Sequence, residues 1–293
     1  MFEFDWFFYA ILAALANGLQ GFLNKTAIEK RNDPYLVTFF SASVSYILAG
    51  IMLFVEKPKI GDLEWLMILG TIGGVGFYFV MISRLRALKY LPSSTVFTLF
   101  RSNILPILAL ILILYALFLE SISLTKLLGV LLIVIAIFIL SKGGEEKTSR
   151  ANFQLGLGLI LLAALISAIL YISQKIAVDI LSINIHSFIF VINLEVAIIS
   201  MIILGYKREV PNKMSSLKNG ALIGVYSYFS FLFFLMAIKR GNLSLIVPVN
   251  SSSFIIPILL SVYFYKEKLT SKKILAALLT LVGLLIIRLP FHG

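Results

Sequence analysis

Long apolar runs, each close to the length of a membrane-spanning helix, follow one another along almost the whole chain. A bilayer core about 30 Å thick needs roughly 20 apolar residues per helix, and backbone polar groups in lipid must be bonded within each segment. Apolar residues make up 60% of the 293 residues and charged residues only 13%, too few to cover the surface of a water-soluble protein. We therefore expect an all-α integral membrane protein.

The spacing of the runs predicts ten transmembrane helices. The expected spans of the first half cover residues 6–28, 35–55, 64–88, 93–118 and 124–141, and those of the second half cover 155–178, 185–205, 218–238, 243–264 and 271–289. A charged linker at 142–152 separates a first repeat at 1–141 from a second repeat at 153–293. The N-terminal MFEFDWFF is acidic and leads into a run too long for a signal peptide, so we interpret it as the start of the first span.

The two halves are similar to each other at an offset of about 150 residues, which indicates a repeat architecture. Ala13-Ala14-Leu15 recurs at 163–165, and Asn24-Lys25-Thr26-Ala27 is matched by Gln174-Lys175-Ile176-Ala177. Because each half has an odd number of spans, the second half must enter the membrane from the opposite side. Such inverted repeats can open a midplane site to either side in turn, although duplication could also simply give a stable bundle.

Three segments resemble the drug/metabolite transporter superfamily, specifically its EamA-type ten-helix members. These segments are ILAALANGLQGFLNKTAI, ALKYLPSSTVFTLF and YFYKEKLTSKKILAALLTLVGLLII. The loop with Glu267, Leu269 and Thr270 is similar to the family's glycine-glutamate-x-leucine-threonine signature, but neither this copy nor the one beginning at Leu119 keeps the glycine. The resemblance implies two five-helix repeats around a central cavity lined by the first, third and fourth spans and their repeat mates. It leaves amino acids, nucleotide sugars, sugar phosphates and drugs open as substrates.

Two ionisable residues lie deep in the expected spans, where a charge is costly and marks a candidate functional site. Arg101 lies about 12 Å along the fourth span from Ser93. Its planar guanidinium could bind a substrate carboxylate or phosphate, or it could pair with Glu195 of the seventh span. Glu195 could also bind a coupling proton. The resemblance puts the seventh span at the periphery, so we favour an ion-pair or packing role.

Uncharged polar residues at helical spacing complete the candidate substrate-binding site. Residues three, four or seven positions apart share one helix face. The candidates are Asn17, Gln20 and Asn24 on the first span, Asn103 beside Arg101, Ser167, Tyr171 and Gln174 on the sixth span, and Asn250 and Ser252 on the ninth. The alternative is that these groups form hydrogen bonds between helices.

Several further residues have matching positions in the two halves. Pro106 and Pro257 lie mid-helix and predict either paired hinges or kinks that shape the bundle. Lys25 and Lys175 are interpreted as interfacial anchors, with gating as the alternative. The glycines at 70–76 predict a close approach of helices and not a phosphate loop.

Other function classes lack their usual residues. The net charge of +11 comes from basic residues scattered between apolar runs, which does not predict nucleic-acid binding. The chain has no cysteine and two isolated histidines, His186 and His292, so we expect no metal site and no cofactor. No nucleophile, base and orienting group occur together, and we do not expect an enzyme.

These features predict a secondary transporter, an exporter or permease of small polar metabolites such as amino acids or related anionic compounds. It would work by alternating access about a midplane cavity. The alternatives are an efflux carrier for hydrophobic drug-like compounds and, from another class, a membrane scaffold or lipid-modifying enzyme. We expect a multi-pass protein of the plasma membrane whose partners are a small-molecule substrate and the lipid bilayer. A monomer is compatible with the sequence. The positive-inside rule places both termini outside, whereas the resemblance places them in the cytoplasm, so the orientation stays open.

Overall fold

Helices form all the regular structure that the computed structural model describes, which covers residues 5–58, 62–90, 123–141, 150–206, 213–266 and 270–289. In these parts, seven helices are long and apolar enough to cross a membrane. The all-helical membrane fold is thus confirmed. The fourth expected span, at 93–118, lies outside the described residues, and the count of ten stays a prediction.

The chain divides into two compact units, and each unit takes helices from both halves of the sequence. Unit 1 comprises Met1–Phe79 and Leu170–Arg240, and unit 2 comprises Val80–Ile169 and Gly241–Gly293. Each half therefore contributes to both units, and neither unit is made of one sequence half alone.

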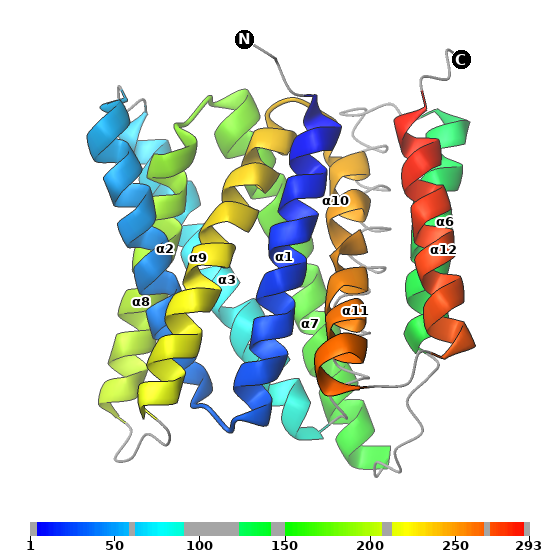
Figure 1. Ribbon diagram of the computed structural model, residues 1–293. Coiled ribbons are helices and arrows are strands. Elements are labelled where there is room, and N and C mark those ends of the chain that lie inside the picture. The colour runs from blue at the N-terminus through cyan, green and yellow to red at the C-terminus, as the bar shows by residue number, and fades with distance from the viewer. Residues whose placement is uncertain are drawn as a thin grey trace. The chain divides into compact units, whose positions relative to one another are not determined.

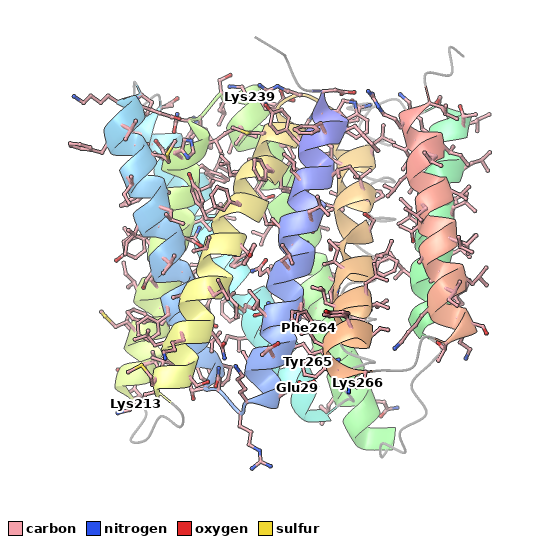
Figure 2. The ribbon with its side chains drawn as sticks, viewed as in Figure 1. Glu29, Lys213, Lys239, Phe264, Tyr265 and Lys266 are labelled. Carbon is pink, nitrogen blue, oxygen red and sulfur yellow. The ribbon has the colours of Figure 1, made fainter. Side chains whose placement is uncertain are left out.

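Unit 1 contains two whole spans from each half of the sequence, together with parts of two others. Its elements are α1 (Trp6–Glu29), α2 (Pro34–Glu56), the first part of α3 (Leu63–Tyr90), the end of α7 (Arg150–Lys175), the π-helical turn η1 (Ile176–Ile180), α8 (Ile185–Gly205) and α9 (Lys213–Ile238). Helix α1 packs along α9, and α2 packs along both α8 and α9 (Figure 1). Glu29 and Lys213 lie at one end of this unit and Lys239 at the other, so charged groups mark the helix ends (Figure 2).

Glycines bring α9 close to α2. A methyl group on Gly224 would lie 2.6 Å from the carbonyl oxygen of Ser41, and one on Gly220 would lie 2.8 Å from Cβ of Phe40. Real side-chain carbons do not approach a neighbouring backbone this closely, so the crossing requires glycine. The hydroxyl of Ser45 donates a 2.8 Å hydrogen bond to the carbonyl oxygen of Gly224 across the same crossing.

The same crossing occurs between α3 and α8. Gly70 and Gly74 precede the two glycines of α9 by 150 residues, and a methyl group on them would meet Val191 at 2.5 Å and Glu195 at 2.8 Å. Val191 in turn follows Phe40 by 151 residues. The two contacts are equivalent under the repeat, and the predicted close approach of helices at 70–76 is confirmed.

A single inserted residue distinguishes the first connections of the two halves. The offset between the halves is 150 residues at Ala27 and Ala177 but 151 at Asp33 and Asn184, whose side chains cap the N-termini of α2 and α8. The π-helical turn η1 accommodates the extra residue, because its backbone N–H groups bond to carbonyl oxygens five residues earlier instead of four. Both halves therefore begin their second span with the same capping chemistry.

Unit 2 contains two helices that cross at paired glycines and a helix that is broken in the middle. Its elements are the end of α3, α6 (Leu124–Ser141), most of α7, α10 (Leu243–Ser251), the 3₁₀ turn η2 (Ser252–Phe254), α11 (Ile255–Tyr265) and α12 (Ser271–Arg288). Helices α6 and α12 meet where a methyl group on either Gly129 or Gly283 would lie 2.7 Å from the other's carbonyl oxygen. Their outer faces carry exposed leucine and isoleucine side chains, which suits contact with hydrocarbon.

Candidate functional site

The polar stripe of α1 lies opposite the most exposed side of that helix. Asn17, Gln20 and Asn24 are half-buried, whereas Phe8 and Leu15 are exposed. Since successive helical residues are turned by about 100°, these apolar residues lie roughly half a turn from the stripe. The three amides therefore face the interior side of α1.

The α7 stripe contains one polar group that is bonded within its own helix and one that has no partner. The hydroxyl of Ser167 donates to the carbonyl oxygen of Ala163 at 2.8 Å. The ring of Tyr171 packs 5.5 Å from that of Phe234 on α9. Gln174 is only 7% exposed, and within the described structure its amide oxygen has no hydrogen-bond partner. Of the three predicted residues, Gln174 holds the unused hydrogen-bonding capacity.

The polar patch of the ninth span coincides with the break in that span. Asn250 ends α10 together with Ser251, and Ser252 begins the 3₁₀ turn η2. The hydroxyl of Ser252 donates to the carbonyl oxygen of Val249 at 2.6 Å. Pro257 follows the turn and lacks the N–H that would bond to the carbonyl oxygen of Ser253, four residues back and in the middle of η2. A mid-helix 3₁₀ turn is typical of a hinge or a strained segment.

Arg101, Asn103 and Pro106 lie outside the described residues, as do the motif residues Glu120 and Glu267. The role of Arg101 as an anion ligand stays a prediction.

Glu195 has a partner on the neighbouring helix. Its Oε1 accepts a 2.6 Å hydrogen bond from the hydroxyl of Thr71 on α3. Its Cβ lies where Gly74 leaves room for it. This contact supports the packing interpretation, while the alternative pairing with Arg101 concerns a residue outside the described part.

Two lysines that are equivalent under the repeat each pair with a carboxylate one turn further on. Lys25 Nζ lies 4.0 Å from Glu29 Oε1, and Lys175 Nζ lies 3.0 Å from Asp179 Oδ2. Half-exposed pairs at this spacing stabilise a helix only slightly, by about 0.3–0.5 kcal/mol. Anchoring and gating both remain compatible with this arrangement.

The sequence interpretation did not identify a cluster of Glu56, His186 and Tyr228. The imidazole Nε2 lies 3.3 Å from Glu56 Oε1, and Nδ1 lies 3.1 Å from the hydroxyl of Tyr228, whose ring stacks on the imidazole. In the sequence, His186 is an isolated histidine with no second histidine near it. The pairing of α2 with its repeat mate α8 brings the C-terminal residue of one helix to the first turn of the other. Antiparallel packing of these two helices was the signal that could have revealed the cluster.

Groups of three or more histidine, aspartate or glutamate side chains that could hold a metal ion do not occur among the described residues.

Comparisons with known proteins match the chain over nearly its full length. A model of the EamA-like transporter family matches it twice, over residues 5–142 and 154–289. A solved crystal structure superposes with a TM-score of 0.77 at 17% sequence identity and covers 96% of this chain and 98% of its own. At this identity the likeness shows the fold alone. No curated protein gives a significant match.

Proposed function

Because the chain belongs to the EamA-like transporter family, we propose that it is a secondary transporter of a small polar metabolite, such as an amino acid or a related anionic compound. Members of this family are multi-pass membrane transporters of the drug/metabolite transporter superfamily and not enzymes, and the predicted family is confirmed. The substrate class, the alternating access and the plasma-membrane location belong to the proposal.

The observation that carries the proposal is the buried amide of Gln174. An amide oxygen removed from water without a partner costs about 1–3 kcal/mol, which a water molecule or a polar ligand offsets. Asn24 is the repeat mate of Gln174, so each half contributes an amide from its first span. Paired amides suit a substrate that has both hydrogen-bond donors and acceptors. Arg101 would bind its anionic group.

The proposed mechanism uses the broken ninth span. A carrier with inverted repeats exposes its site to either side by bending or rocking of equivalent elements. The turn η2 together with Pro257 is a candidate hinge, because neighbouring backbone bonds are already interrupted there.

Thermal stabilisation of the purified full chain by a panel of metabolites tests this function. A ligand that binds the folded protein raises its unfolding temperature by mass action. We expect polar anionic metabolites to stabilise the wild type and Gln174→Ala to lose most of this response. Ser167→Ala is the matched control, since that hydroxyl is bonded within its own helix. Full stabilisation of Gln174→Ala would contradict the site, and full stabilisation of both Arg101→Ala and Arg101→Lys would contradict the anion role.

A carrier of hydrophobic compounds is the second candidate. The tilted ring contact between Tyr171 and Phe234 favours it, because aromatic side chains contribute large apolar surfaces to a binding site. Stabilisation by the apolar members of the panel alone would select this candidate.

A further inference from the structure

The cluster of Glu56, His186 and Tyr228, here called the histidine cluster, joins three helices of unit 1. Glu56 is the last residue of α2, His186 lies in the first turn of α8, and Tyr228 lies inside α9. The Glu56 side chain is 40% exposed, whereas Tyr228 is only 3% exposed. The cluster therefore runs from a helix end into the packed interior of the unit.

When the imidazole of His186 is neutral, both of its ring nitrogens have a suitable hydrogen-bond partner in the cluster. In the tautomer with hydrogen on Nε2, that N–H donates to the Glu56 carboxylate, and Nδ1 accepts the O–H of Tyr228. The other tautomer would place the lone pair of Nε2 against the carboxylate. The contacts therefore assign the hydrogen to Nε2.

Adding a proton to the imidazole reverses one of these bonds. The proton comes from water and bonds to the lone pair of Nδ1, so both ring nitrogens become donors. The oxygen of Tyr228 must then accept, and its own hydrogen must turn towards a different acceptor. His186 is the only partner of this hydroxyl within the described structure. A buried O–H left without an acceptor is unfavourable, so the link between α8 and α9 has to rearrange.

We propose that the histidine cluster is a proton-binding site whose occupancy sets the hydrogen bonding between α8 and α9. Glu56 accepts the Nε2–H of the imidazole in both states, and its half-exposed carboxylate offsets the positive charge that the added proton brings. The direction of the hydrogen bond at Tyr228 therefore depends on the charge of His186. Tyr228 belongs to α9, which also packs on α1 and α2.

No other ionisable side chain contacts His186 within the described part of the chain. Glu56 is its partner from α2 and Tyr228 its partner from α9. Helix α3 packs further along α8, where Glu195 bonds to Thr71 and not to the cluster. The inference goes beyond the proposed function, and its failure would leave the transport proposal untouched.

Carbon-13 NMR of the full chain in lipid nanodiscs tests the proposal. The chain has two histidines, so His292→Gln leaves His186 as a single labelled imidazole. We expect its Cε1 signal and the Cζ signal of Tyr228 to move together, with one midpoint, as the pH of the sample is varied between about 5 and 8. The Tyr228 signal is assigned by its loss in Tyr228→Phe.

Variants separate a proton switch from simple packing. Removing the titrating ring in His186→Gln should abolish the movement of the Tyr228 signal, and Tyr228→Phe should change the midpoint of His186. Tyr226→Phe, two residues away on α9, is the matched control and should leave both signals as in the parent. If His186→Gln does not fold, Glu56→Gln should change the common midpoint instead. A Tyr228 signal indifferent to the titration of His186, or a His186 signal that stays constant over this range, would overturn the proposal.

Discussion

The two equivalent helix crossings of unit 1 share their backbone geometry but differ in their polar contacts. Where α9 crosses α2, Gly224 lies against Val44, and a methyl group on it would be 2.8 Å from the valine Cβ. Where α3 crosses α8, Gly74 lies at the same distance from Cβ of Glu195, the residue that follows Val44 by 151 positions. The repeat thus determines how closely the backbones approach, whereas a carboxylate occurs in one copy alone.

The partner of this carboxylate is specific to the same copy. Thr71 donates to Glu195, and the residue 150 positions later is Ala221. Conversely, Ser45 bonds across the α2 and α9 crossing, and the residue 151 positions later is Val196. Among the described residues, each crossing therefore has a polar contact that the other lacks, added to a shared glycine framework.

The largest expected effect on stability comes from changing a glycine at one of the two helix crossings. Gly224→Val would force a side chain to within 2.6 Å of the Ser41 carbonyl oxygen, where backbone and not a flexible side chain must move. We expect a loss of about 1–3 kcal/mol or failure to fold, measured by thermal unfolding in detergent. Gly158→Val is the control, since no atom of the described neighbouring residues lies within 4 Å of a methyl group at that position. Equal destabilisation by the two variants would mean that the crossing does not require glycine.

The next largest effect on stability comes from breaking the hydrogen bond between Thr71 and Glu195. Thr71→Ala leaves the Glu195 carboxylate without its donor, and we expect a loss of about 1–3 kcal/mol in unfolding free energy. The double variant Thr71→Ala with Glu195→Val reproduces the apolar pair of the other crossing, and we expect it to regain most of this stability. If the double variant were the less stable of the two, the two crossings would not be interchangeable.

The smallest effect concerns the polar contact of the other crossing. Ser45→Ala removes a hydrogen bond to a carbonyl oxygen of α9, and we expect it to cost about 0.5–1.5 kcal/mol in the same unfolding assay. Ser43→Ala on the same helix is the control and should change stability less. An effect of Ser45→Ala as large as that of Thr71→Ala would remove the distinction between neutral and charged contacts.

The positions of the apolar runs predicted the spans that the structure describes, because lipid selects apolar residues along the full length of a helix. The expected span at 185–205 coincides with α8, and that at 35–55 falls one residue short of α2 at each end. Glycine spacing also predicted the crossing of α3, since a residue without a side chain in an apolar run is typical of helix contact.

The remaining features depend on contacts that a one-dimensional pattern does not contain. The turn η1 changes the hydrogen-bonding pattern of a helix inside an apolar run, and η2 breaks the ninth span at a polar patch that the sequence interpretation assigned to the substrate site alone. The histidine cluster joins residues far apart in the sequence, and a lone histidine gives no sign of its neighbours. For the candidate site, the structure adds that Gln174 is buried and that its amide oxygen has no hydrogen-bond partner among the described residues. The role of Arg101 still rests on the sequence alone.

The central claim is that the two halves of the chain cross the membrane in opposite directions. Since the protein has no cysteine, Lys30→Cys and Ile180→Cys place single thiols at equivalent, exposed positions 150 residues apart. With a membrane-impermeant maleimide applied to one face of sealed vesicles, we expect one variant to be labelled and the other to be labelled only after the vesicles are opened. Labelling of both thiols from the same face would contradict the inverted repeat.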